Sequence, residues 1–117
     1  MIKKTHSAKT IEEKKEEVEK IKEKYPKKVF IYLEKNKNCK NIHEIDKNKY
    51  LCPKDMLFNQ FICLIRKRLK ITDKQSLIFF IGNSIPNPST TMQELYEKYK
   101  SIDDFLYIKY SGENFFG

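Results

Sequence analysis

The sequence predicts an α+β fold in which one helix crosses the face of a four-stranded mixed sheet. Three observations support this. The 117 residues suffice for one hydrophobic core but not for two. Helical and strand-like segments follow in the order helix, strand, strand, helix, strand, helix, strand. Only one helical segment has a broad apolar face, as a helix packed across a sheet requires.

The first element is a helix that begins after Thr10 and ends before Pro26. Thr10 and Glu13 have the spacing of a capping box, and a proline stops a helix because it lacks the N–H donor. The apolar residues form a narrow stripe, so we expect this helix on the surface of the domain. Residues 2–8 are expected either to form a further short helix or to remain frayed.

Two strands follow, over residues 29–34 and 49–53. The first is rich in β-branched and aromatic residues, and the second ends at Pro53, which suits an edge strand. The residues between them are polar and rich in asparagine. We therefore expect an antiparallel hairpin with a wide connecting loop.

The second half begins with the central helix, for which Asp55 is the expected N-cap. Its broad face consists of Leu57, Phe58, Phe61, Ile62, Leu64, Ile65 and Leu69. A continuously apolar strand over residues 76–82 is expected to be buried on both faces. A second capping box opens a short helix at Thr91, and residues 105–110 form the last strand.

This order of elements matches the ubiquitin-like β-grasp preceded by N-terminal helices, although small RNA-binding α/β folds share much of it. We expect an N-terminal helical extension over residues 1–25 and the β-grasp domain over residues 26–110. Residues 111–117, "SGENFFG", are expected to form a flexible tail.

The composition indicates a soluble protein whose surface is basic. Charged residues make up 34% and hydrophobic residues 39% of the chain, and the net charge is +8. Of the 24 basic residues, 15 lie in residues 1–49. Such a surface favours an acidic partner: a nucleic acid, an anionic membrane or an acidic peptide. Three cysteines without CxxC spacing, no signal peptide and no apolar run of membrane-spanning length indicate a cytosolic protein.

Residues with catalytic or metal-binding chemistry do not form a recognisable site. No glycine-rich phosphate loop is present, and Cys39 with His43 would supply only two of the four ligands of a structural zinc site. Cys63 is expected to be a small buried residue of the central helix, and Asp103 and Asp104 to cap a turn. We therefore expect no enzyme activity, no metal and no cofactor.

A peptide-binding site is the sharper prediction. An edge strand over residues 49–53 could accept an extended peptide as an added strand, with pockets beside it for alternate side chains. Phe61 and Leu64 lie one turn apart on the neighbouring helix. Their pattern fits a pocket and the hydrophobic core equally well.

Specific segments resemble the autophagy-related protein 8 and GABARAP family of ubiquitin-like modifiers. The resemblance extends from about residue 10 to the end, and its IRKR, KYL-P, YS and terminal FG elements have the order and spacing of the family. It rests on "EKIKEKYPKKV" (19–29), "IDKNKYLCPKDM" (45–56), "QFICLIRKRL" (60–69), "LIFFIGNSIPNPSTTMQELYEKYK" (77–100) and "DFLYIKYSGENFFG" (104–117).

This resemblance implies a modifier that is joined through Gly117 to the amino group of phosphatidylethanolamine by E1-like and E2-like enzymes. A cysteine protease removes the modifier from the lipid. The conjugated protein would act in the cytoplasm and on the autophagosome membrane, where it binds cargo receptors with aromatic-x-x-aliphatic motifs. It would be a monomer in solution and bind no nucleic acid.

The resemblance also implies two peptide-binding pockets and a set of basic contacts. The first predicted pocket, for the aromatic residue, consists of Glu17, Ile21, Phe30, Lys49, Leu51 and Phe105. The second predicted pocket, for the aliphatic residue, consists of Tyr50, Cys52, Pro53, Met56, Phe61 and Leu64. Acidic residues of the motif would meet Lys28, Lys47, Lys49 and Arg68.

The chain departs from the family pattern at Phe30, Cys52, Asp104 and the loop over residues 36–46. At Phe30 the family usually has a small residue or proline, so a phenylalanine is expected to fill part of the first predicted pocket. Two other functions fit parts of the sequence. A basic nucleic-acid-binding module would account for the charge, and a ubiquitin-like scaffold that is never conjugated would account for the fold.

Overall fold

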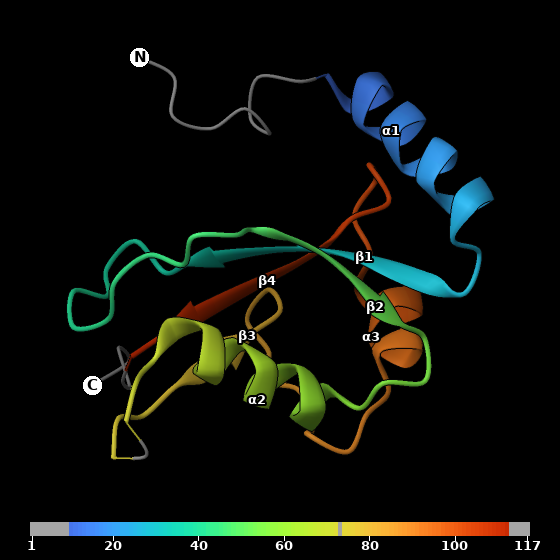
Figure 1. Cartoon of the computed structure of the whole chain (residues 1–117). Helices are drawn as coiled ribbons and strands as arrows, with labels where there is room; N and C mark the ends of the chain where they lie inside the picture. Colours follow the sequence, from blue (N-terminus) through green and yellow to red (C-terminus); the bar gives the residue numbers. More distant parts are fainter. Residues whose placement is uncertain (1–9, 73, 113–117) are drawn as a thin grey trace.

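A four-stranded mixed sheet forms the centre of the structure, a computed structural model that describes residues 10–72 and 74–112 (Figure 1). Its strands are β1 (Lys28–Lys35), β2 (Lys49–Pro53), β3 (Ile78–Phe80) and β4 (Leu106–Ser111), in the order β2-β1-β4-β3. β1 pairs antiparallel with β2 and parallel with β4, and β3 pairs antiparallel with β4. The predicted hairpin and mixed sheet are therefore confirmed, with β2 and β3 as the two edges.

Three helices are described: α1 (Ile11–Lys24), α2 (Phe58–Leu69) and α3 (Met92–Tyr99). Figure 1 shows α1 and α2 on opposite sides of the sheet. Both predicted capping boxes are present, since the hydroxyl groups of Thr10 and Thr91 accept the N–H three residues on at 3.1 Å. The further helix expected over residues 2–8 lies outside the described residues.

The predicted start of the central helix at Asp55 is wrong. α2 begins at Phe58 after the N-cap Leu57, whose N–H donates to the Gln60 side chain at 2.8 Å. The chain at the start of α2 instead bonds the chain at the start of α3: Phe58 N–H donates to the carbonyl of Thr90, and Met92 N–H to that of Met56, each at 2.8 Å. These tertiary hydrogen bonds keep the chain extended where the local sequence favours helix.

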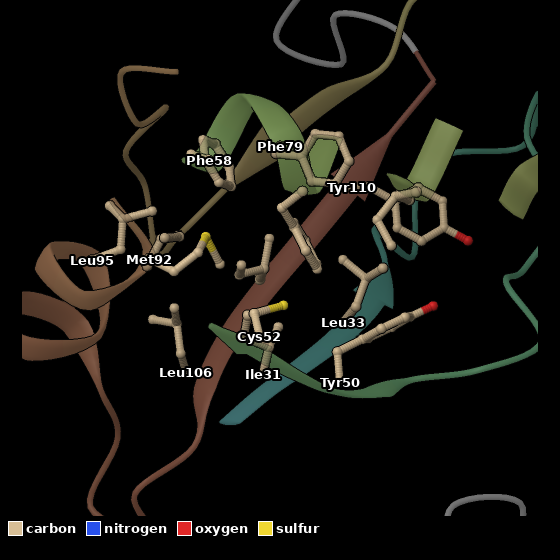
Figure 2. Close-up of a cluster of buried hydrophobic side chains, with 14 of the residues drawn as sticks. Ile31, Leu33, Tyr50, Cys52, Phe58, Phe79, Met92, Leu95, Leu106 and Tyr110 are labelled. Atoms are coloured by element: carbon tan, nitrogen blue, oxygen red, sulfur yellow. The ribbon is translucent and has the colours of Figure 1, made fainter. Parts of the chain in front are cut away.

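Alternate residues of β1 point into two separate hydrophobic clusters. Ile31 and Leu33 face α2 and belong to the main core, which Figure 2 shows with Met92 and Leu95 of α3 at one end and Tyr110 at the other. The intervening Phe30 and Tyr32 face α1, where they pack with Val18, Ile21, Phe105 and Tyr107. The expected surface helix α1 thus buries one side chain fully, Val18.

The third strand is shorter than the predicted segment 76–82. β3 contains three residues and lies at an edge, but Phe79 and Phe80, which point to opposite faces, are both buried. β4 ends one residue later than predicted, at Ser111.

Cys63 is exposed on α2, so its predicted burial is wrong. No helix within the described residues is long and apolar enough to cross a membrane.

The wide loop between β1 and β2 packs against the end of β4. The Tyr110 hydroxyl accepts the Ile45 N–H and donates to the His43 carbonyl, both at 2.9 Å. Gly112 N–H donates to the Cys39 sulfur at 3.1 Å. A Cβ at Gly112 would collide with the Asn41 side chain, so only glycine lets the loop approach this closely. The loop therefore fixes the position at which the chain leaves the sheet.

Candidate functional site

The outer edge of β2 carries main-chain groups that β1 does not use. One residue beyond each end of β2, Asn48 and Lys54 form main-chain hydrogen bonds to the β1 side at 2.7 Å and 3.1 Å. Because such bonds alternate along an antiparallel pair, the N–H and C=O groups of Lys49 and Leu51 point away from β1. Pro53 ends this edge because it has no N–H.

The residues of the first predicted pocket come together between α1 and the sheet. Leu51 lies directly opposite Phe30 in the β1–β2 pair, so both side chains point to the α1 face. The rings of Phe30 and Phe105 are 6.5 Å apart, and both side chains are buried. Ile21 is half-buried against them. Leu51, 39% exposed, is the apolar member that remains at the surface.

Lys49 forms the rim of the first predicted pocket. Its ammonium group is 3.2 Å from the Glu17 carboxylate and 5.9 Å from the centre of the Phe105 ring. The ion pair links β2 to α1, and both groups are partly exposed. The apolar floor is thus bordered by charge and closed beneath by Phe30.

The residues of the second predicted pocket lie on the opposite side of β2, toward α2. Tyr50, Cys52 and Phe61 are buried in the main core, and the Tyr50 and Phe61 rings meet edge to face at 5.8 Å. Pro53 and Met56 are half-buried, and Leu64 is 40% exposed. The structure therefore separates a buried floor from a surface made by Pro53, Met56 and Leu64.

Two ionisable groups of this floor are neutral at physiological pH. Burial raises the pKa of Tyr50 to about 12 and that of Cys52 to about 12. The protonated Tyr50 hydroxyl donates a hydrogen bond to the Lys47 carbonyl at 2.8 Å. The Cys52 thiol is accordingly a packing group, because the thiolate is the nucleophilic form of cysteine.

The predicted basic contacts lie at both ends of β2. Near its start, the Lys47 ammonium is 5.2 Å from the centre of the Tyr50 ring, and Arg68 holds the Asp46 carboxylate through two bonds of 2.8 Å and 3.4 Å. The hydrogen bond from Arg68 lowers the pKa of Asp46. Lys28 lies at the other end, opposite Pro53. An acidic partner would have to compete with Asp46 for Arg68.

The fold also brings together lysines that the sequence analysis did not select. Lys22, Lys54 and Lys100 line one cavity with Lys28, although they come from α1, the turn after β2 and the end of α3. No local motif connects residues so far apart in the chain. Within residues 10–72 and 74–112, no three His, Cys, Asp or Glu side chains are placed to hold a metal ion.

The parallel pairing of β1 with β4 and the helix packed across one face define a ubiquitin-like protein. Similarity to known proteins then identifies the family. A family model described as "Autophagy protein Atg8 ubiquitin like" matches residues 13–117. The chain belongs to this Atg8 family.

Relatives and solved structures agree with that assignment. Autophagy-related protein 8 of Schizosaccharomyces pombe is 43% identical over 108 residues, which cover 92% of this chain and 88% of the relative. The crystal structure of Trypanosoma brucei ATG8 is 34% identical with a TM-score of 0.86, covering 100% of both chains. Plasmodium falciparum Atg8, solved in complex with a Plasmodium falciparum Atg3 peptide, is 28% identical with a TM-score of 0.85, covering 97% and 98%.

Gly117, the predicted conjugation site, lies outside the described residues. The match to the family model nevertheless extends to this residue.

Proposed function

We propose that this protein is a ubiquitin-like modifier joined through Gly117 to phosphatidylethanolamine on autophagic membranes. The support is the family match that runs through Gly117, together with relatives named autophagy-related protein 8. In this role the chain is the substrate of conjugating enzymes and has no catalytic function of its own. Its sites of action are the cytoplasm and the autophagosome membrane.

The proposed conjugation is a sequence of acyl transfers. An E1-like enzyme adenylates the Gly117 carboxylate with ATP and releases pyrophosphate, and its cysteine thiol then displaces AMP to form a thioester. The glycyl group passes to a thiol of an E2-like enzyme, which frees the E1 thiol. The lipid amine then attacks this second thioester, which forms an amide and frees the E2 thiol. The Plasmodium structure with an Atg3 peptide supports a conjugation enzyme as a partner of this fold. A cysteine protease would hydrolyse the amide to recycle the protein.

The second part of the proposal is that β2 binds aromatic-x-x-aliphatic motifs of cargo receptors as an added strand. The observation that carries it is the position of the two predicted pockets on opposite faces of β2, with a free main-chain edge between them. Side chains alternate along a strand, so residues three apart point to opposite faces. A peptide paired with Lys49 and Leu51 would therefore direct its aromatic residue toward α1 and its aliphatic residue toward α2.

Charge would support binding at the same edge. Basic groups at both ends of β2, with Lys47 and Arg68 at one end and Lys28 at the other, can attract acidic residues on either side of the motif. Such complementarity mainly raises the association rate and weakens with salt. The protein as a whole carries a net charge of +8.

Leu51→Ala is expected to weaken binding of an acidic aromatic-x-x-aliphatic peptide by about 1–2 kcal/mol, the usual effect of truncating a central apolar contact. Leu51 is 39% exposed, so the fold should be unaffected. Isothermal titration calorimetry measures the affinity. The matched control is Ile85→Ala, an apolar side chain 60% exposed on the loop after β3, at the other edge of the sheet. Equal affinities for the two variants would contradict the docking site.

Phe30→Val is expected to raise the affinity for a peptide with tryptophan at the aromatic position by about tenfold. The Phe30 ring fills space beside Phe105, and its removal lets a larger ring enter and bury more apolar surface. The free energy of unfolding should fall by about 1–3 kcal/mol, because a cavity remains in the unbound protein. Titration and thermal unfolding measure the two effects. A folded variant that binds this peptide no better than the parent would show that Phe30 does not limit the pocket.

A further inference from the structure

A cavity of about 360 Å³ lies apart from both predicted peptide pockets. Its walls come from the end of α1, the start of β1, the turn after β2 and one side of α3. Figure 1 shows these segments at the same end of the sheet. The volume falls within the range of about 300–1,000 Å³ that is usual for small-molecule sites.

The cavity is strongly basic. Lys22, Lys28, Lys54 and Lys100 line it, and Glu97 is the one carboxylate among its lining residues. Asp104 lies beside them, 3.9 Å from the Lys22 ammonium and 3.6 Å from the Lys100 ammonium. Four lysines against two carboxylates leave two positive charges in excess.

Lys28 and Lys54 contribute positive charge to this cavity that no ion pair among the described residues offsets. Within the described parts of the chain, neither lysine has a carboxylate partner within 4.0 Å, whereas Lys22 and Lys100 share Asp104. Lys22 and Lys100 also lie at helix C-termini, where positive charge offsets the helix dipole. That explanation does not apply to Lys28, in β1, or to Lys54, in a turn. An anion bound in the cavity would be attracted by both of these charges.

The walls hold these lysines in place. The main chain of Lys54 is bonded to Lys27 on one side at 3.1 Å and to Gln93 of α3 on the other at 3.0 Å. The Tyr96 ring lies below the Lys22 and Lys100 ammonium groups, 5.8 Å and 5.6 Å from its centre. The Tyr96 hydroxyl donates to the Asp104 carbonyl at 2.7 Å. The backbone at Lys54 and the ammonium groups of Lys22 and Lys100 are therefore held in position at the cavity.

We propose that this cavity binds the phosphate monoester of a phosphorylated inositol, either free in solution or as the headgroup of a membrane lipid. A phosphate monoester carries a charge of about −1.5 to −2 at neutral pH, which matches the excess of the cavity. Lysine binds phosphate as a point charge and needs no planar geometry. Gln93 and Tyr96 in the wall would offer a polar and an aromatic contact to the inositol ring.

Inositol bisphosphate is the soluble probe, and isothermal titration calorimetry at low salt is the measurement. Lys54→Gln should weaken binding about tenfold, since it removes one charge-assisted contact. Glu97→Gln removes the opposing carboxylate and should strengthen binding about threefold. The control is Lys37→Gln, which removes the same charge as Lys54→Gln from an exposed position in the β1–β2 loop. None of these residues belongs to the proposed peptide or conjugation sites.

A second arm distinguishes the two sources of the ligand. It compares sedimentation with phosphatidylcholine vesicles that contain phosphatidylinositol phosphate or an equal charge of phosphatidylserine. Preference for the phosphoinositide vesicles over the soluble probe assigns a membrane headgroup, and the reverse assigns a soluble ligand. The proposal is overturned if neither probe binds, or if Lys54→Gln and Lys37→Gln bind alike. It is also overturned if the soluble probe fails to bind and phosphatidylserine vesicles bind as well as the phosphoinositide vesicles.

Discussion

Gly117→Ala is expected to abolish conjugation to phosphatidylethanolamine while leaving the domain folded. The reacting carboxylate must enter two enzyme sites and form a thioester in each, and a methyl group beside it restricts both the approach and the backbone angles. Purified E1-like and E2-like enzymes, ATP and vesicles containing phosphatidylethanolamine provide the assay. Intact-mass spectrometry should show the lipid adduct for the parent protein and none for the variant.

The matched control is Gly82→Ala, which makes the same chemical change in the turn after β3. Gly82 has φ +61° and no atom within 4 Å of an added Cβ, so the cost is backbone strain of about 1–2 kcal/mol. This variant should still be conjugated. If Gly117→Ala formed the adduct at the parental rate, the proposed conjugation site would be wrong, whatever the result for peptide binding.

The elements best predicted from the sequence are those set by local signals. The capping boxes at Thr10 and Thr91 depend on residues three apart, and the alternation of buried and exposed residues in β2 depends on neighbours. The start of α2 was not predictable in this way. Residues 56 and 57 are kept extended by the hydrogen bonds and the β-bridge that join this segment to residues 90–92, and no local pattern reveals a partner so distant in the chain.

In the candidate site, too, only the features set by local sequence could be predicted. Period-two alternation places Leu51 and Tyr50 on opposite faces of β2, and the structure buries Tyr50 and leaves Leu51 exposed. A helical face gives less information, because its border residues can be core or surface. Phe61 is 0% exposed and Leu64 40% exposed, although both fit the same apolar stripe. Lys22 and Lys54 line the same cavity only because the tertiary structure brings them together, so the sequence could not predict this.

Phe61→Ala is expected to lower the free energy of unfolding by about 3–5 kcal/mol, the usual cost of removing a fully buried aromatic ring. Its ring lies between those of Tyr50, Phe58 and Phe79, at centre-to-centre distances of 5.8, 6.4 and 6.2 Å. The surrounding rings belong to three different elements and cannot all move into the space. Chemical denaturation followed by circular dichroism measures the loss.

Leu64→Ala separates this structural role from a role in binding. Leu64 is one turn further along α2 but 40% exposed, so its truncation should cost less than about 1 kcal/mol of stability. It should weaken binding of the aromatic-x-x-aliphatic peptide by about 1 kcal/mol, because a contact with the aliphatic residue of the peptide is lost. A Phe61→Ala protein as stable as the parent would contradict the core assignment. Unchanged peptide affinity of Leu64→Ala would contradict the assignment of Leu64 to the aliphatic pocket.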